Sequence, residues 1–375
     1  VTPPATRPAA PPAASASQPA ADPARPSALS AELFYQLLVG EMAARTNDPG
    51  TGFGLVLDAA RRTNDPAVYQ RAIEIALQAR AGESALQAAR AWRQAHPGSR
   101  EANRYLLQIL LALNRVAETA EPLRALLAAT PDAERGATLS LVPRLYARAS
   151  DKALAARVAE QALAEATAQA AHAAPAWTAI GRLRLAAGQA GPALEAAQRA
   201  QEAGPQDEGP ALLALELLSP QQPQAEALVR RYLAGPSALP ELRMAYARVL
   251  LDAQRNADAR DQLERITVQR PDFAEAWLVL GVLQVQEGQA DAGEAALKRY
   301  VDMAQAAGQA EERARGLAQA YLALAQVAEK RGDLPLASAW LDKIRSPQDL
   351  VAAQGRRASL LAKQGRMDEA RKLLQ

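Results

Sequence analysis

The stretch AWTAIGRLRLAAGQAGPALEAAQRAQEAGP, residues 176–205, decides the fold expected for this chain. Positions 4, 8, 15, 20, 27 and 32 of a 34-residue frame are occupied by Trp177, Gly181, Gly188, Ala193, Ala200 and Pro205. Position 8 must be small if a second helix crosses the first there, with position 20 packing into the notch. Gly188 tolerates positive φ and can end the first helix, and Pro205 stops the second. The stretch therefore predicts two antiparallel helices joined by a tight turn.

The same frame recurs along the chain, which predicts an array of similar helix pairs. Partial matches occur at Tyr69, Ala85, Trp92 and Pro97, at Tyr246, Ala247, Ala259 and Pro271, at Trp277, Gly281, Gly288 and Gly293, at Tyr321, Gly332 and Ala337, and at Gly365 and Ala370. This spacing is that of tetratricopeptide repeats, and we count roughly ten units with the degenerate ones included. We therefore expect an all-α, right-handed superhelical solenoid of tetratricopeptide repeats, with the aromatic residues in its core rather than stacked on a ligand.

Composition supports a helical array and excludes several classes of function. Of 375 residues, 49% are apolar but only 4% are aromatic, and Ala and Leu supply most of the apolar side chains. These residues suit many thin helical layers better than one thick core. With no cysteine there is no disulfide, thiolate nucleophile or Cys-based zinc site. A net charge of +2 gives no electrostatic reason to expect nucleic acid, and no apolar run is long enough to span a bilayer.

No constellation of residues in the sequence indicates catalysis. His96 and His172 are isolated, and each is expected to lie near the end of a helix and cap its carbonyl groups. The run Thr51–Gly54 lacks the strand and the lysine of a phosphate-binding loop, so we expect a flexible turn there. Paired carboxylates are interpreted as solvated helix surface. We therefore predict a protein that is not an enzyme, with no catalytic, cofactor or metal site.

Composition also divides the chain. Residues 1–28, with 8 of the 25 prolines before residue 27, are expected to form a disordered Pro/Ala-rich linker. Residues 29–66 are expected to form an N-terminal helical cap and a degenerate repeat, and residues 67–375 the solenoid. Because the last frame is incomplete at Gln375, we expect the natural protein to continue beyond it.

In this repeat geometry, positions 2, 5, 9 and 12 of each first helix line a concave groove. The mixture of apolar and polar groups at these positions suits an extended peptide or a helix. The candidate groove residues are Gln70, Glu74, Leu77, Arg104, Gln108, Leu111, Thr178, Arg182, Leu185, Met244, Arg248, Leu251, Leu278, Val282, Val285, Leu322, Gln326 and Glu329. The alternative is a solvated groove without a ligand.

Residues 31–97 carry more than the generic repeat pattern. They contain the runs LFYQLLVGEMA (33–43) and RRTNDP (61–66), followed by Arg71-Ala72, Trp92 and Pro97. This region resembles a family of proteobacterial repeat lipoproteins of the outer membrane, which includes the adaptor of a periplasmic carboxyl-terminal-processing protease. The resemblance implies a lipidated cysteine upstream of Val1, a periplasmic tether, and a helical spiral that delivers protein substrates, such as peptidoglycan hydrolases, to the protease.

The resemblance thus predicts a periplasmic protein-binding adaptor, anchored to the outer membrane by its lipid alone. Its partners would be the processing protease and the substrate proteins. An N-terminal docking helix would contain Leu33, Phe34, Leu37, Leu38 and Glu41, although these residues are equally suited to covering the first repeat. The alternative function is a structural scaffold in an envelope machine, such as exopolysaccharide export or outer-membrane assembly.

Overall fold

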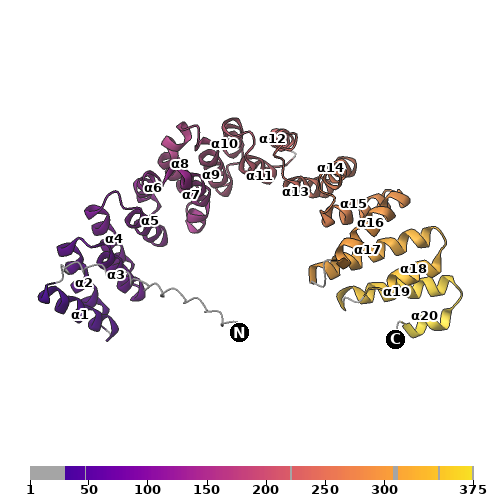
Figure 1. Ribbon diagram of the computed structural model, residues 1–375, viewed down its shortest axis with the longest axis horizontal. Coiled ribbons are helices and arrows are strands. Elements are labelled where there is room, and N and C mark those ends of the chain that lie inside the picture. The colour runs from indigo at the N-terminus through magenta and orange to yellow at the C-terminus, as the bar shows by residue number, and fades with distance from the viewer. Residues whose placement is uncertain (1–29, 47, 220–221, 307–310, 345–346, 374–375) are drawn as a thin grey trace, which may run out of the picture. The chain divides into compact units, whose positions relative to one another are not determined.

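The computed structural model describes residues 30–373 except 47, 220–221, 307–310 and 345–346. The predicted linker, residues 1–28, lies outside the described residues. Every regular element in the described part of the chain is a helix, which confirms the predicted all-α repeat fold (Figure 1). The chain divides into two compact units, residues 1–115 and 116–375, which are described separately below.

Unit 1 is a run of helices in which each packs against the next. Its helices are α1 (Ala31–Arg45), α2 (Pro49–Thr63), α3 (Pro66–Gln78), α4 (Gly82–Ala95) and α5 (Arg100–Ala112). The core of this unit is centred on Trp92, whose ring stacks on Tyr69 at 6.5 Å and meets Tyr105 at 5.6 Å. Trp92 and Tyr69 are both 2% exposed, which confirms their expected place in the core.

The pairing of α1 with α2 corrects one expectation. Residues Thr51–Gly54 were expected to form a flexible turn but lie inside α2, which Asp48 caps by accepting a hydrogen bond from the amide of Thr51. A Cβ on Gly52 would lie 2.7 Å from the backbone oxygen of Gly40 and 2.7 Å from the amide nitrogen of Ala44. Gly52 therefore allows the two helix backbones to touch.

Unit 2 continues the array of helix pairs. Its elements are η1 (Val116–Glu118), α6 (Ala120–Ala128), α7 (Asp132–Leu145), η2 (Tyr146–Arg148), α8 (Lys152–Ala168), α9 (Ala173–Ala186), α10 (Ala190–Ala203), α11 (Glu208–Glu216), α12 (Pro223–Leu233), α13 (Pro240–Asp252), α14 (Asn256–Gln269), α15 (Ala274–Gln286), α16 (Ala290–Ala306), α17 (Glu311–Lys330), α18 (Leu334–Leu341), α19 (Pro347–Lys363) and α20 (Met367–Leu373). The degenerate unit near residues 208–239 is the shortened pair α11–α12. Helices α16 and α17 are 17 and 20 residues long, and they lie where the turn glycines Gly288 and Gly332 are 44 residues apart in the sequence rather than 34.

Most helix pairs are joined by a turn that contains one residue with positive φ. The α7–α8 connection differs, because it contains the 3-10 helix η2. Gly188, expected to tolerate positive φ, has φ +73°, and Gly288 has φ +84°. The next amide then donates to a carbonyl five residues back, as from Gln289 to Gln284. Other residues adopt the same conformation at this position, including Gln254 with φ +58°. The turn is thus imposed by the helix pair and not only by glycine.

The predicted helix crossing is observed between α15 and α16. Gly281, at position 8, would clash with the side chain of Leu297 if it carried a Cβ, at 2.7 Å. Gly293, at position 20, would place a Cβ 2.9 Å from the backbone oxygen of Gly281. The two glycines therefore face each other across the notch that the repeat frame predicts.

Candidate protein-binding surfaces

In unit 1, the candidate groove residues lie on α3 and α5 with their side chains partly or fully exposed. Leu77 is 47% exposed. Arg104 is exposed with its guanidinium 5.5 Å from the ring centre of Tyr105. Gln70 donates to Glu74 at 3.0 Å, so these two polar groups already satisfy each other. Each of these two helices thus offers one apolar residue flanked by polar ones, a pattern that suits a peptide ligand. On α5, Gln108 is exposed like Arg104, and Leu111 is half-buried.

In unit 2, the candidate residues that stay at the surface are tied to the neighbouring first helix by ion pairs. Arg248 on α13 pairs with Glu275 on α15. Glu329 on α17 pairs with Lys363 at 2.5 Å and Arg356 at 3.5 Å, both on α19. The hydrogen bond from Lys363 lowers the pKa of Glu329. A ligand on this surface must therefore compete with these ion pairs. The remaining half-buried candidates are Thr178, Arg182, Leu185, Leu251, Val282, Leu322 and Gln326.

The prediction is wrong for three of the groove residues, because their side chains are buried. Met244, Leu278 and Val285 are 2%, 7% and 2% exposed. Met244 packs in the apolar core of α10–α15, and Leu278 packs in the next core, which also contains residues of α17. Val285 fills the space left by Gly293, whose added Cβ would lie 2.7 Å from the Val285 Cγ2. The usual Ala at that position would leave no such space.

Helix α1 presents an apolar face, though not with all the predicted residues. Phe34 and Leu38 are exposed, at 57% and 45%, but Leu33 is buried at 6% and so cannot contact a partner. Exposed side chains that the sequence analysis did not select are Tyr35, at 67%, and Met42, at 58%. The spacing of Phe34, Leu38 and Met42, four residues apart, is the signal that could have identified this stripe.

The other two members of the predicted docking helix hold α1 in place. Leu37 is half-buried against the unit 1 core. Glu41 accepts two hydrogen bonds from Arg71 of α3, at 2.5 and 2.7 Å, and the hydrogen bonding lowers the pKa of the Glu41 carboxyl group. The sequence suited α1 equally to covering the first repeat. One face of α1 does so, while the opposite face stays exposed.

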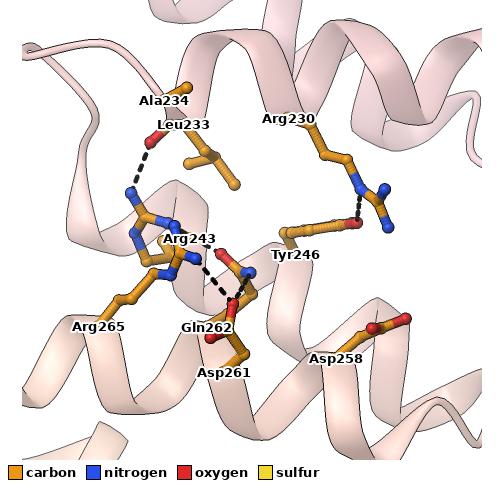
Figure 2. A pocket seen from close by; sticks show the side chains of 9 residues that line it. All are labelled: Arg230, Leu233, Ala234, Arg243, Tyr246, Asp258, Asp261, Gln262 and Arg265. Carbon is orange, nitrogen blue, oxygen red and sulfur yellow. Dashed lines mark hydrogen bonds and ion pairs between the residues drawn. The ribbon is translucent and has the colours of Figure 1, made fainter.

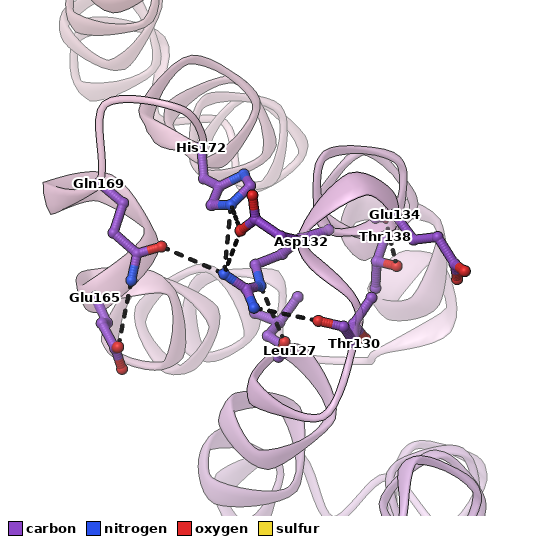
Figure 3. Close-up of polar contacts among 9 residues, drawn as sticks. Leu127, Thr130, Asp132, Glu134, Thr138, Glu165, Gln169 and His172 are labelled. Carbon is purple, nitrogen blue, oxygen red and sulfur yellow. Dashed lines mark hydrogen bonds and ion pairs between the residues drawn. The ribbon is translucent and has the colours of Figure 1, made fainter.

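The two histidines have structural contacts. His96 ends α4, and its Nε2 donates to the backbone oxygen of Asn64 at 2.7 Å, so it caps the end of α2 rather than its own helix. His172 was expected to lie near the end of a helix, but it directly precedes the first residue of α9. Its Nε2 lies 2.8 Å from Asp132 Oδ1 (Figure 3). That hydrogen bond and the positive charge of Arg135 lower the pKa of Asp132. This cluster joins the beginnings of α7 and α9.

Neither histidine belongs to a metal cluster in the described part of the chain, where no three His, Asp or Glu side chains are placed to hold an ion. None of the described helices is both long and apolar enough to span a bilayer.

Comparison with known proteins identifies the repeat class. Residues 244–311 match a family model described as a tetratricopeptide repeat. No curated protein sequence matches the chain. Among solved structures, the crystal structure of yeast Tom70 is similar at 11% identity, covering 91% of this chain and 90% of that chain with a TM-score of 0.33. That likeness carries no argument about function.

The helix pairs and the recurring frame define a fold of the tetratricopeptide-repeat type, and the family match covers residues 244–311 of it. Proteins of this class are scaffolds whose extended helical surfaces bind other proteins. No enzyme family is among the matches.

Proposed function

We propose that this chain is a non-enzymatic adaptor of the bacterial periplasm, anchored to the outer membrane as a lipoprotein. In this proposal it binds a carboxyl-terminal-processing protease and delivers to it protein substrates such as peptidoglycan hydrolases. The repeat array supplies the protein-binding scaffold. The finer assignment is supported by the resemblance of residues 31–97 to the repeat lipoproteins described above and by the Pro/Ala-rich composition of residues 1–28.

The observation that carries the proposal is the exposed face of α1. Phe34, Tyr35, Leu38 and Met42 expose large apolar side chains on one helix of unit 1. Contiguous apolar surface of this kind marks a site of protein interaction. The same residues lie within the LFYQLLVGEMA run that carries the family resemblance, so sequence and surface support one docking element.

A pull-down from envelope extract tests the proposal. The tagged full chain is expected to recover a PDZ-containing serine protease together with peptidoglycan hydrolases. The double variant Phe34→Ser/Leu38→Ser should lose the protease, because it removes two of the four exposed apolar side chains of α1. The matched control is Val268→Ser on α14, an isolated apolar side chain that is 79% exposed. It should recover the protease as the unmodified chain does.

The alternative is a structural scaffold in an envelope machine. Recovery of polysaccharide synthase or assembly-barrel subunits, without any protease, would favour it and contradict the adaptor. The residues encoded upstream of Val1 provide a second test, since a lipobox ending in cysteine is required by the lipid anchor and a cytoplasmic start would exclude it.

A further inference from the structure

A cavity of about 350 Å³ lies among α12, α13 and α14 of unit 2 (Figure 2). Apolar groups of Leu233, Ala234 and Tyr246 line it, together with charged and polar side chains. The charged and polar lining residues are Arg230, Arg243, Asp258, Asp261, Gln262 and Arg265. Its volume is at the lower end of the range of small-ligand sites, about 300–1,000 Å³. It can hold a group of the size of one amino-acid side chain and its carboxylate.

The cavity exists where the repeat frame is broken. Arg243 stands 34 residues before Trp277, so it occupies position 4, where the following unit has Trp277 and the unit that begins with α9 has Trp177. Trp277 donates its indole N–H to the backbone oxygen of Pro271 at 2.9 Å. A guanidinium N–H of Arg243 donates instead to the backbone oxygen of Leu233, the last residue of α12, at 2.6 Å. An arginine thus replaces the bulky indole.

Arg243 is a buried cation that forms no ion pair with a carboxylate among the described residues. Its side chain is 3% exposed, and it donates otherwise only to the neutral Oε1 of Gln262, at 2.8 Å. The Arg243 Nε is buried and has no acceptor. Burying an uncompensated charge costs several kcal/mol, so such groups are normally paired. Burial and the nearby charge of Arg265 lower the pKa of Arg243.

The other charged groups around the cavity already have partners. Arg265 pairs with Asp261 at 3.1 Å, and Arg230 pairs with Glu226 at 2.7 Å. The Tyr246 hydroxyl donates to Glu226 at 2.6 Å, which fixes the ring that forms one wall. Asp258 pairs with Arg255 at 2.5 Å. Arg243 is therefore the charged group of the cavity lining that has no ion pair in the described part of the chain, although the charge of Asp261 partly offsets its own.

We propose that this cavity binds a carboxylate group of a protein ligand, held by Arg243. Three arginines and two aspartates line the cavity, which leaves one formal positive charge and suits a monoanion. The aspartates would repel a phosphate dianion. The apolar wall receives the adjoining carbon chain. The carboxylate can be that of a chain terminus or of an Asp or Glu side chain, since both present the same two oxygens to a guanidinium.

This inference rests on the proposed function only in taking the ligand to be a protein. It names a site between helices that is separate from the apolar face of α1. A titration with small carboxylates tests the cavity itself, whereas the pull-down tests the partner, so the two proposals can fail independently.

The test is NMR of the full chain with ¹⁵N-labelled arginine, following the Nε–H signal of Arg243. N-acetyl-L-leucine represents a terminal carboxylate, N-acetyl-glutamic acid α-amide represents a side-chain carboxylate, and N-acetyl-leucinamide has no carboxylate. Saturable shifts are expected with one or both acids, at a Kd of about 1–10 mM for ligands of this size. The acid that binds more tightly identifies the source of the carboxylate. The amide should not bind.

Two variants separate binding from folding. Arg243→Gln removes the charge, and Arg243→Trp introduces the residue of the following repeat, whose indole should fill the cavity. For each variant, binding is followed on the Nε–H signal of Arg265, which lines the same cavity. Both should lose binding, with the Tm of Arg243→Trp equal to or above that of the unmodified chain. Arg231→Gln, an exposed charge on α12 outside the cavity, is the matched control and should bind as before. Absence of saturable binding, equal binding of the amide, or binding retained by Arg243→Gln would overturn the proposal.

Discussion

Replacing Gly293 with alanine tests the helix crossing at the centre of the repeat. An added Cβ would lie 2.7 Å from Val285 Cγ2, 2.9 Å from the Gly281 backbone oxygen and 3.0 Å from the Val285 amide nitrogen. Two of these contacts are with backbone atoms, so no change of rotamer relieves them. Overpacking of this kind costs about 1–3 kcal/mol. The better helix propensity of alanine returns about 1 kcal/mol.

We therefore expect Gly293→Ala to lower the free energy of unfolding by about 1 kcal/mol, the difference of these two terms. The repeat frame alone predicts the opposite, because Ala is the usual residue at this position. The matched control is Gly136→Ala in α7, where no atom lies within 4 Å of the added Cβ. That variant should gain up to about 1 kcal/mol, since only the propensity changes.

The assay is urea unfolding of both variants, followed by circular dichroism. Hydrogen exchange of α15 and α16 accompanies it, because repeat arrays can unfold in parts. Faster exchange in these two helices should accompany the loss in Gly293→Ala. Equal stabilisation by both substitutions would refute the close approach of α15 and α16.

Three further predictions concern the turns, a carboxylate and the core. Gln254→Gly should raise the Tm, with a gain of about 1 kcal/mol, because glycine adopts φ +58° without strain. Hydrogen bonds to Glu226, that from Arg255 foremost, lower the pKa of the Glu226 carboxyl group to about 2. The stability that the ionised carboxylate contributes to the fold is therefore fully present above the pKa of Glu226 in the unfolded chain, and it is lost as the pH falls through about 2. Glu226→Gln should accordingly be less stable than the unmodified chain at pH 7, by about 1–2 kcal/mol, and the difference should vanish near pH 2 in urea titrations. Trp92→Ala should destabilise unit 1 by about 3–5 kcal/mol, seen as faster hydrogen exchange in α3–α5, whereas unchanged exchange would contradict its place in the core.

The sequence predicted those parts of the fold that depend on residue size and on glycine. The notch at Gly281 and the turn at Gly188 follow directly from the absence of a side chain. The turn at Gln254 was not predicted, because glutamine does not favour positive φ. The one indication of this turn in the sequence is the distance of Gln254 from Gly288. Counting 34 residues back from Gly288 would have identified it.

The candidate surfaces were harder to predict because burial depends on contacts between repeats. Position 12 is exposed or half-buried in most units, yet Val285 is buried because Gly293 leaves space beside it. Tyr35 and Met42 lie within the run that carries the resemblance. They were missed because the exposure of each side chain depends on which face of α1 packs on α2, and the run alone does not show this. Arg243 was missed because the aromatic Tyr246, three residues later, was taken as the marker of that unit.

Reconstituted proteolysis tests the proposed role of this chain as an adaptor for a processing protease. A purified carboxyl-terminal-processing protease of the same envelope is mixed with a peptidoglycan hydrolase, and the cleavage rate is measured with and without the full chain. Bringing both proteins onto one scaffold should raise the rate by at least about tenfold at sub-saturating concentrations. The Phe34→Ser/Leu38→Ser variant should lose this increase and Val268→Ser should keep it. Equal cleavage rates with and without the chain would contradict the claim.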